Sequence, residues 1–377
     1  MIIVLFSAVS LTLTLLYAAF LFFLRNGWQK IPAYKPVSIN PKTKVSVLIA
    51  ARNEAESIHL TIEDIINQNY PKELFELIIV DDHSTDDTSK IITSYAGRGV
   101  KLIQLNESKP LNSYKKKAIT EAIKLANGEL MVATDADCRM AANWLLTIVG
   151  LYQQNNYNLI SSPVVYYQEK TLFERLQTLE FLYLIGLGAA GIGNKMPSTC
   201  NGANLAYKKD VFLKLGGFTG IDDLASGDDE LFLHKVASAY PGTIGFCKNY
   251  DALVYTHAKP NMKEFIQQRR RWASKSVKYK DKKIIVLAVC VWLFNISLAF
   301  NFIMAFFYPG FLALVCTQFL IKFTAELFFI APLTAFVKRN GLITKLSFLT
   351  FLHVVYLIYI GIMGNAGKYN WKGRLVK

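Results

Sequence analysis

Two aspartates, Asp135 and Asp137, directly follow the apolar stretch of residues 130–134. The apolar and small residues of that stretch predict a short buried strand, which places both carboxylates at its C-terminal end, where open α/β sheets bind their ligands. Two carboxylates on one loop can hold a hard divalent cation, and such a cation is often shared with substrate phosphates. The pair also fits a helix cap or a turn. The surrounding sequence must decide between nucleotide chemistry and a structural role.

The chain around this pair alternates between short strands and amphipathic helices. Strand-like segments lie at residues 45–51, 76–80, 100–105 and 130–134, with helical spacing of apolar residues between them. Repeated β-α units of this length predict a mostly parallel sheet covered by helices, with ligands gathering where the strands end. Three polar loops fall at such ends: Arg52-Asn53-Glu54, Asp81-Asp82 and Asp135-Ala136-Asp137.

The second half of this region is less regular and richer in glycine. Glycine allows tight turns and close backbone approach, so we expect loops that shape the wall of a pocket. Residues 181–192 predict a buried helix rather than a membrane insertion, because the run is too short to span. The expected wall loops are residues 186–193, 201–204, 216–218 and 226–231.

The composition argues against a purely soluble protein. Of the 377 residues 52% are hydrophobic, and the mean hydropathy is +0.26, with several long uncharged runs. The net charge of +14 comes from basic clusters beside apolar runs, which favours an anionic membrane face over nucleic acid. The five widely spaced cysteines form no CxxC motif. They indicate neither a disulfide framework nor a zinc site, and they fit a reducing compartment.

The chain begins with an uncharged segment that is long enough to cross a bilayer. We interpret residues 1–24 as a retained transmembrane anchor, because a cleavable signal peptide would need a basic start and a shorter core. Five basic residues and no acid follow in residues 25–44, a proline-containing linker. This charge places the C-terminal side of the anchor in the cytoplasm, which predicts an integral protein of the inner or plasma membrane with the α/β domain, residues 45–262, in the cytoplasm.

The C-terminal third combines a basic segment with further apolar runs. Residues 263–283 contain nine basic residues against two acids, as in a helix that lies on an anionic membrane face. Residues 284–364 hold about three candidate spans, the second of which requires Lys322 and Glu326 to neutralise each other one helical turn apart. Three full crossings would leave the basic tail of residues 365–377 outside. One of the runs is therefore expected to be re-entrant or interfacial.

Six segments, in order, resemble motifs of the membrane-bound family 2 glycosyltransferases, whose catalytic domain has the nucleotide-sugar-binding fold called GT-A. The resemblance covers residues 45–272, and Gln-x-x-Arg-Trp is its most specific motif. Two positions differ: Tyr114 replaces the glycine of a Gly-Lys-x-x-Ala-Leu segment, and Gly227 replaces the glutamate of the Glu-Asp motif. The matching segments are residues 45–54, 79–86, 115–119, 134–137, 226–231 and 268–272.

The resemblance implies roles for single residues on the donor side. Asp81 would contact the base, and the loop with Arg52 and Glu54 would contact the nucleotide. Lys115 or Lys117 would contact a phosphate. Asp137, helped by Asp135, would hold Mg²⁺ or Mn²⁺ on the diphosphate.

On the acceptor side, the resemblance implies that Asp228 acts as the base that takes the proton of the acceptor hydroxyl, with Asp229 as the alternative. Arg271 would add positive charge near the diphosphate. Gln268 and Trp272 would contact acceptor or diphosphate, and the sugar carbon would be inverted.

These expectations combine into an enzyme that transfers a sugar from a nucleotide donor, with UDP-linked sugars expected, to a lipid-linked or membrane-delivered saccharide acceptor at the cytoplasmic face of the bilayer. A processive polysaccharide synthase is the alternative within enzymes, because it shares Gln-x-x-Arg-Trp, although about three C-terminal segments are few for a pore. A catalytically silent membrane scaffold that keeps the fold is the alternative from another class.

Overall fold

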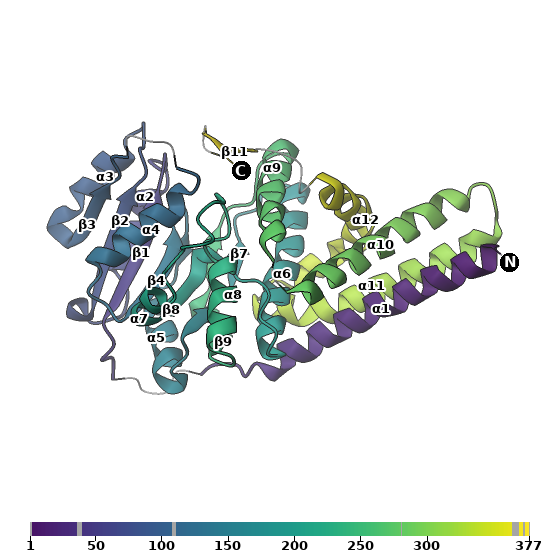
Figure 1. Ribbon diagram of the computed structural model, residues 1–377, viewed down its shortest axis with the longest axis horizontal. Coiled ribbons are helices and arrows are strands. Elements are labelled where there is room, and N and C mark those ends of the chain that lie inside the picture. Colours follow the sequence, from purple (N-terminus) through teal and green to yellow (C-terminus); the bar gives the residue numbers. More distant parts are fainter. Residues whose placement is uncertain are drawn as a thin grey trace.

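The computed structural model describes residues 2–35, 40–107, 111–279, 281–363, 369–371 and 374–376. An α/β domain forms one end of the molecule, and long apolar helices extend from it to the N-terminus at the other end (Figure 1). Parts of the predicted linker, last span and tail lie outside the described residues, namely Pro36, Gly364, Lys368, Lys372 and Lys377.

The main sheet has seven strands in the order β3-β2-β1-β4-β8-β6-β9. The first four of these run parallel to their neighbours, while β8 is antiparallel to both β4 and β6. The predicted α/β sheet is therefore confirmed, and it is mixed. Its strands are β1 (Val45–Ala51), β2 (Phe75–Asp81), β3 (Val100–Gln104), β4 (Leu130–Asp135), β6 (Leu159–Ser161), β8 (Leu205–Lys208) and β9 (Ile244–Phe246). A smaller sheet contains β5 (Arg139–Met140), β10 (Val254–Thr256) and β7 (Val164–Tyr166).

The register brings the ends of three strands to one edge. Ala51 of β1 lies opposite Asp81 of β2, and Ala50 lies opposite Asp135 of β4. Parallel strands that end in register deliver their following loops to the same place. The polar loops after β1, β2 and β4 therefore meet, as the sequence predicts.

Helices cover both faces of the main sheet because successive side chains of a strand point to opposite faces. Val47 and Ile49 belong to one buried cluster with Ile62 of α2, whereas Leu48 belongs to another with Ile119 of α4. The helices of the domain are α2 (Ile58–Ile66), α3 (Thr88–Ser94), α4 (Tyr114–Leu125), α5 (Trp144–Asn155), α7 (Lys209–Lys214) and α8 (Glu230–Ala239).

Helix α6 (Leu172–Gly193) connects the domain to the apolar helices. Its last turns contain residues 186–193, so the expectation of a loop there is wrong. The glycines serve close helix packing instead: a β-carbon on Gly193 would lie 2.1 Å from the carbonyl oxygen of Gly27 in α1, and one on Gly27 would lie 2.2 Å from the carbonyl oxygen of Ala190. Small residues at a crossing let two helical backbones approach closely.

Five helices of the described chain are long and apolar enough to cross a membrane. They are α1 (Ile2–Lys30), α6, α10 (Lys282–Met304), α11 (Gly310–Phe336) and the segment that contains α12 (Leu346–Met363). In the most apolar 18-residue stretch of each helix, 72% of the stretch in α6 is buried in the protein, compared with 33% in α1 and 28% in α10. Helix α6 is thus largely enclosed by protein.

A polar cluster lies inside the apolar helices. Lys322 Nζ is 2.5 Å from Glu326 Oε1 on the same helix, so the predicted pairing one turn apart is confirmed. Tyr17 of α1 donates to Glu326 Oε1 (2.7 Å), and Thr350 of α12 donates to Glu326 Oε2 (2.6 Å). One buried carboxylate therefore ties three helices together.

The basic segment is not one helix. Helix α9 (Met262–Ala273) ends at the short 3₁₀ helix Ser274–Lys278, and α10 begins at Lys282. The buried residues of α9 are Phe265 and Arg269. Phe265 contacts Tyr356 of α12 and Arg269 pairs with Glu180 of α6, so α9 packs against these two helices.

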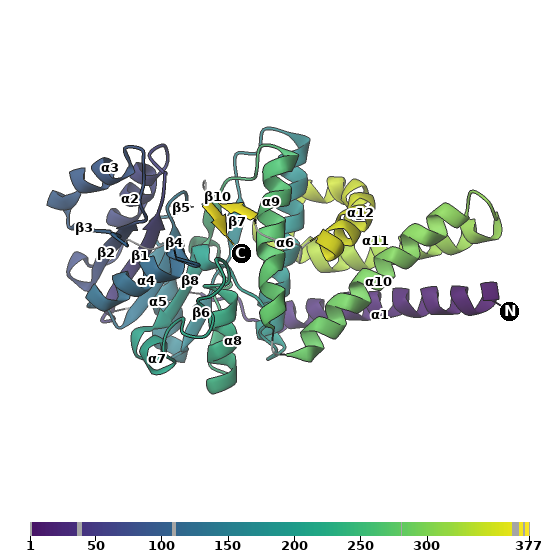
Figure 2. The same cartoon turned by 45° about the horizontal axis from the view of Figure 1, so that its top comes forward.

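Helix α12 keeps both of its ends near the α/β domain. Before it, Arg339 donates to Glu169 (2.8 Å). After it, β11 (Tyr369–Trp371) pairs with β12 (Arg374–Val376), and Arg374 contacts Asp82 of the domain. Helices α9 and α12 lie near the junction of the two parts (Figures 1 and 2), and β11 lies close to α9 (Figure 1). Segments on either side of α12 thus contact the α/β domain.

We expect Glu326→Gln to lower stability strongly, because removing one partner of a buried ion pair typically costs about 3–5 kcal/mol. The double variant Lys322→Met/Glu326→Leu should recover much of the loss, since it leaves no buried charge unpaired. Thermal unfolding of the protein in a mild detergent measures both. Glu56→Gln, an exposed carboxylate of the domain, is the control. A Glu326→Gln protein as stable as this control would contradict the interpretation.

Candidate active site

A cleft of about 630 Å³ opens at the edge where β1, β2 and β4 end. It collects most of the residues that the sequence singles out. Asp81 and Lys117 are the two that do not line it. Those that do are Arg52, Glu54, Lys115, Asp135, Asp137, Asp228, Asp229, Gln268, Arg271 and Trp272.

The loops after β1 and β2 are bound to each other. Arg52 Nη1 donates to the carbonyl oxygens of Asp82 (2.7 Å) and His83 (2.8 Å), while the backbone N–H of Thr85 donates to Asn53 Oδ1 (2.8 Å). Asn53 and His83 have φ of 51° and 55°, in the left-handed region that few residues other than glycine adopt. The hydrogen bonds hold both loops in this shape.

The two aspartates that end β2 have different surroundings. Asp81 is buried and accepts from the N–H of Ser84 (3.3 Å) and from Ser89 Oγ (2.8 Å). Asp82 lines the cleft, and Arg374 Nη1 lies 2.8 Å from both of its carboxylate oxygens. The Arg374 guanidinium also stacks on Tyr114, at 3.6 Å from the ring centre. Burial, and then this neighbouring cation, lower the pKa of Arg52.

The carboxylates of the Asp-x-Asp loop fit a hard divalent cation. The oxygens of Asp135 and Asp137 lie within 4.8 Å of one another and of Cys138 Sγ. Burial raises the pKa of the Cys138 thiol well above its usual range, so this residue remains a protonated filler rather than a thiolate ligand. Two carboxylates that leave room for phosphate oxygens and water are a donor set that suits Mg²⁺ or Mn²⁺.

Lys115 links this loop to the opposite wall. Its amine is 2.7 Å from Asp135 Oδ1 and 3.3 Å from Asp228 Oδ2. Burial alone would lower its pKa, but the two carboxylates outweigh burial and raise it, so Lys115 stays charged. Lys117 points elsewhere: its amine is 2.8 Å from Glu121 on the same helix.

The adjacent Asp228 and Asp229 have different contacts. Asp229 caps α8, accepting from the N–H of Glu230 (2.6 Å) and from the N–H of Gly202 (3.0 Å). Burial would raise the pKa of Asp229, but Lys275 and these N–H groups hold it below its ordinary value. Asp228 meets Lys115 in the cleft. Gly227 has φ of 85°, which favours glycine and explains the missing glutamate.

The Gln-x-x-Arg-Trp segment forms the far wall. Arg269 Nη1 donates to Gln268 Oε1 (2.6 Å), and the Arg269 guanidinium forms an ion pair with Glu180 of α6. It also lies 4.3 Å from the centre of the Trp272 ring. Arg269 is thus a buried support for this segment, while Arg271 lines the cleft.

An apolar wall completes the cleft on the side of the long apolar helices. It is formed by α6 and α12, and Tyr356 OH lies 3.3 Å from Glu180 Oε1 at its edge. The apolar residues of this wall are Leu184, Ile185, Leu187, Leu357 and Ile360.

Several of these residues were missed by sequence reasoning. Glu180 is an acid inside an apolar helical run, which is a recognisable signal that a basic partner exists. Lys275, which pairs with Glu230 at 2.9 Å, and Arg374 offered no such signal, because they belong to segments that are basic throughout.

The domain resembles glycosyltransferases in both its fold and its sequence. In a comparison with solved structures, the chain has the GT-A fold of the mannosyltransferase PcManGT from Pyrobaculum calidifontis, determined with GDP-Man and Mn²⁺. The TM-score is 0.62 at 20% identity, over 93% of this chain and 99% of that one. Residues 46–216 match the family model Glycosyl transferase family 2, the family whose motifs this sequence resembles.

Curated relatives are similar to this chain over part of their length. The chain is 28% identical over 254 residues to the probable glycosyltransferase YdaM of Bacillus subtilis, covering 65% of this chain and 58% of that protein. It is 34% identical over 116 residues to the beta-monoglucosyldiacylglycerol synthase of a Nostoc species, covering 31% of this chain and 25% of that protein. The matches span between a quarter and three fifths of these relatives.

We expect Arg374→Gln to weaken the binding of nucleoside diphosphates by roughly 10-fold or more, since hydrogen bonds to charged groups contribute about 1.5–3 kcal/mol. Without Arg374, the buried Asp82 carboxylate would repel an incoming diphosphate. Calorimetry with UDP and GDP measures the change. Lys263→Gln removes an exposed charge of α9 as the control. Equal affinities for Arg374→Gln and this control would refute the expectation.

Proposed function

We propose that this protein transfers a sugar from a nucleoside diphosphate donor, with UDP-sugars as the first candidates, to a lipid-linked or membrane-delivered acceptor. The observation that supports this best is the composition of the cleft. One wall carries the carboxylates and lysine suited to a diphosphate, and the other consists of apolar residues from α6 and α12. A cleft with both walls suits an acceptor that combines a polar head with an apolar chain.

On the donor side, the proposed roles follow from the charges of the residues in the cleft. Asp135 and Asp137 would hold Mg²⁺ or Mn²⁺, which when bound supplies positive charge to the leaving diphosphate. Lys115, already charged beside Asp135, and Arg271 would add to this stabilisation. Arg52 and the loop after β2 would hold the nucleotide. Asp81 would act at the base from beneath the cleft, and Asp82 with Arg374 would line its mouth.

On the acceptor side, Asp228 would act as the general base. The acceptor hydroxyl forms a bond to the anomeric carbon while the bond from that carbon to the diphosphate oxygen breaks, and Asp228 takes the hydroxyl proton. One such displacement inverts the sugar carbon. The Lys115 contact orients the Asp228 carboxylate within the cleft. Trp272, with its flat apolar face, would contact the acceptor or the sugar.

The bilayer would surround α1, α10 and α11, with the α/β domain on the cytoplasmic side. The basic residues that follow α1 support this orientation. The segment after α12 supports it as well, because Arg374 of the basic tail contacts the domain.

A panel of radiolabelled nucleotide sugars tests the proposal directly. Membranes that contain the protein are incubated with each donor and extracted with organic solvent, so that the label reports donor, acceptor polarity and product length together. A solvent-soluble product with one or a few sugars is expected. Long glycosidase-sensitive polymer made by the purified protein would establish the processive synthase instead, and no transfer from any donor would favour a silent scaffold.

We expect transfer to require a divalent cation, because Asp135 and Asp137 offer a hard donor set beside the phosphate contacts. Activity should disappear in excess EDTA and return with Mn²⁺ or Mg²⁺. Asp137→Asn should reproduce the loss without chelator. Full transfer in excess EDTA would rule out the assignment of these two residues.

We expect Asp228→Asn to lower the transfer rate by roughly 10² to 10⁴, the usual range for a lost general base, with nucleotide affinity retained. Asp229→Asn is the matched control. An asparagine oxygen can still cap α8, so this variant should keep more activity while losing some stability. Transfer rates and calorimetric nucleotide affinities of both proteins decide the matter. Near-normal transfer by Asp228→Asn with a collapse in Asp229→Asn would show that Asp229 is the base.

A further inference from the structure

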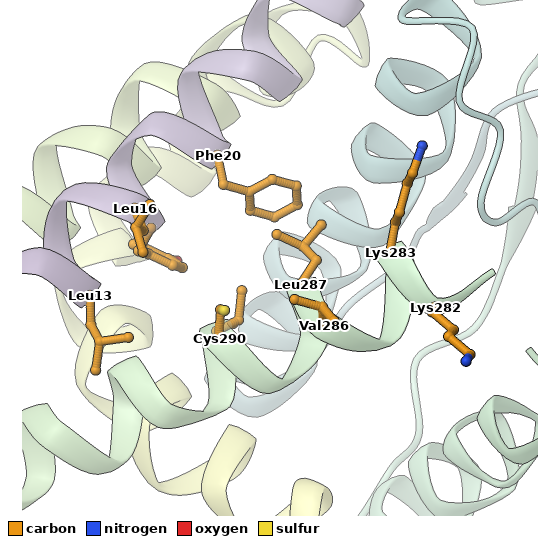
Figure 3. Close-up of a pocket in the computed structure, with 10 residues that line it drawn as sticks. Leu13, Leu16, Phe20, Lys282, Lys283, Val286, Leu287 and Cys290 are labelled. Atoms are coloured by element: carbon orange, nitrogen blue, oxygen red, sulfur yellow. The ribbon is translucent and has the colours of Figure 1, made fainter.

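A second pocket lies between α1 and α10, away from the cleft. Its lining forms two matching stripes, at intervals of three and four residues on α1 and of four residues on α10, so each helix presents one face to the space. Figure 3 shows these faces opposite each other. The stripes consist of Leu13, Leu16, Tyr17 and Phe20 on α1, and of Lys282, Lys283, Val286, Leu287, Cys290 and Val291 on α10.

The space exists because the two helices part as they approach the α/β domain. Farther along they are in contact: Tyr17 stacks on Phe294 with ring centres 4.5 Å apart, and Phe6 meets Phe300 at 4.8 Å. Toward the domain, a groove of about 400 Å³ opens. This volume falls within the range of about 300–1,000 Å³ that is typical of pockets for small molecules.

The groove is open to the surroundings of the helices. Leu16 and Val286, one from each wall, are 53% and 60% exposed. In a bilayer, these side chains face hydrocarbon, so the material that fills the groove is a lipid chain rather than water.

The mouth of the groove is positively charged. Lys282 and Lys283 lie in the first turn of α10, and their side chains extend to different sides of it (Figure 3). Both are exposed, and within the described part of the chain neither amine has a carboxylate within ion-pair distance. Basic pockets between membrane helices on the cytoplasmic side bind anionic headgroups.

We propose that this groove binds an anionic glycerophospholipid of the surrounding bilayer. One acyl chain lies between α1 and α10, and the phosphate lies at the mouth, where the first turn of α10 carries Lys282 and Lys283. The stripe on α10 from residue 282 to residue 291 rises roughly 13–14 Å along the helix, close to the half-thickness of about 15 Å of a bilayer's hydrocarbon core. The groove therefore fits a chain from a single leaflet.

This lipid is distinct from the acceptor. The groove and the cleft share no lining residue, and the cleft has its own apolar wall from α6 and α12. The bound lipid fills the space between the first and the third of the long helices, so it holds α10 against the anchor.

Lipid retention tests the proposal. The full-length protein is purified in a neutral detergent and exposed separately to phosphatidylglycerol, phosphatidylcholine and glycerol phosphate, and native mass spectrometry counts the bound molecules. We expect one tightly held phosphatidylglycerol, at least 10-fold weaker binding of phosphatidylcholine, and no binding of glycerol phosphate. This pattern requires both the charge of the headgroup and the acyl chain.

Two variants and two controls distinguish lipid binding in the groove from general electrostatic attraction to the protein. Lys282→Gln/Lys283→Gln should lower phosphatidylglycerol retention about 10-fold, and Cys290→Trp should lower it by filling the groove without a change in charge. Lys263→Gln/Lys345→Gln removes the same charge elsewhere, and Cys316→Trp adds the same ring to an exposed position of α11. Both controls should retain the lipid.

Retention by both site variants would overturn the proposal. Equal loss in the charge control would overturn it as well, since that result would mean general electrostatic attraction. Thermal unfolding of each variant without lipid shows whether it is folded, so that loss of lipid is not confused with loss of structure.

Discussion

The ion pair between Glu180 and Arg269 joins the long apolar helices to one wall of the cleft. Glu180 belongs to α6, which packs against α1, and Arg269 belongs to α9, which carries Gln268 and Trp272 into the cleft. A buried ion pair is tolerated only while both partners are present and hydrogen-bonded. The Gln-x-x-Arg-Trp segment therefore keeps its place because Glu180 of α6 lies where Arg269 can pair with it.

The same principle of paired charge recurs around the cleft. Lys115 lies between Asp135 and Asp228, Lys275 lies beside Asp229 and Glu230, and Arg374 lies against Asp82. Acids outnumber bases in the first two groups. A diphosphate that enters adds further negative charge, and this is the physical reason why a divalent cation at Asp135 and Asp137 suits the site.

The sequence predicted best those parts of the site whose place in the fold follows from a local sequence pattern. The loops after β1, β2 and β4 could be predicted because each strand has a short apolar core and parallel strands end at one edge. The choice between Lys115 and Lys117 could not be made from a motif alone. Two residues apart on a helix, their side chains point in nearly opposite directions, and only the packed helix shows which one faces the cleft.

Contacts between distant segments were beyond the sequence. Hydropathy shows that the apolar run of α12 is long enough to cross a bilayer. It does not show the direction of the helix, because that depends on its packing against α10 and α6. The pair of Arg374 and Asp82 joins residues 292 positions apart. Nothing in a uniformly basic tail distinguishes that arginine from its neighbours.

The crossing of α1 and α6 at Gly27 and Gly193 has a consequence for the choice of acceptor. Since the two backbones approach closely there, α1 packs firmly against the helix that forms part of the apolar wall of the cleft. If α1 anchors the protein in a bilayer, as proposed, the cleft would lie at a fixed height above the membrane, and only an acceptor of matching length would reach it. A hydroxyl one sugar closer to the lipid, or one farther away, would miss the Asp228 carboxylate even if its chemistry were the same.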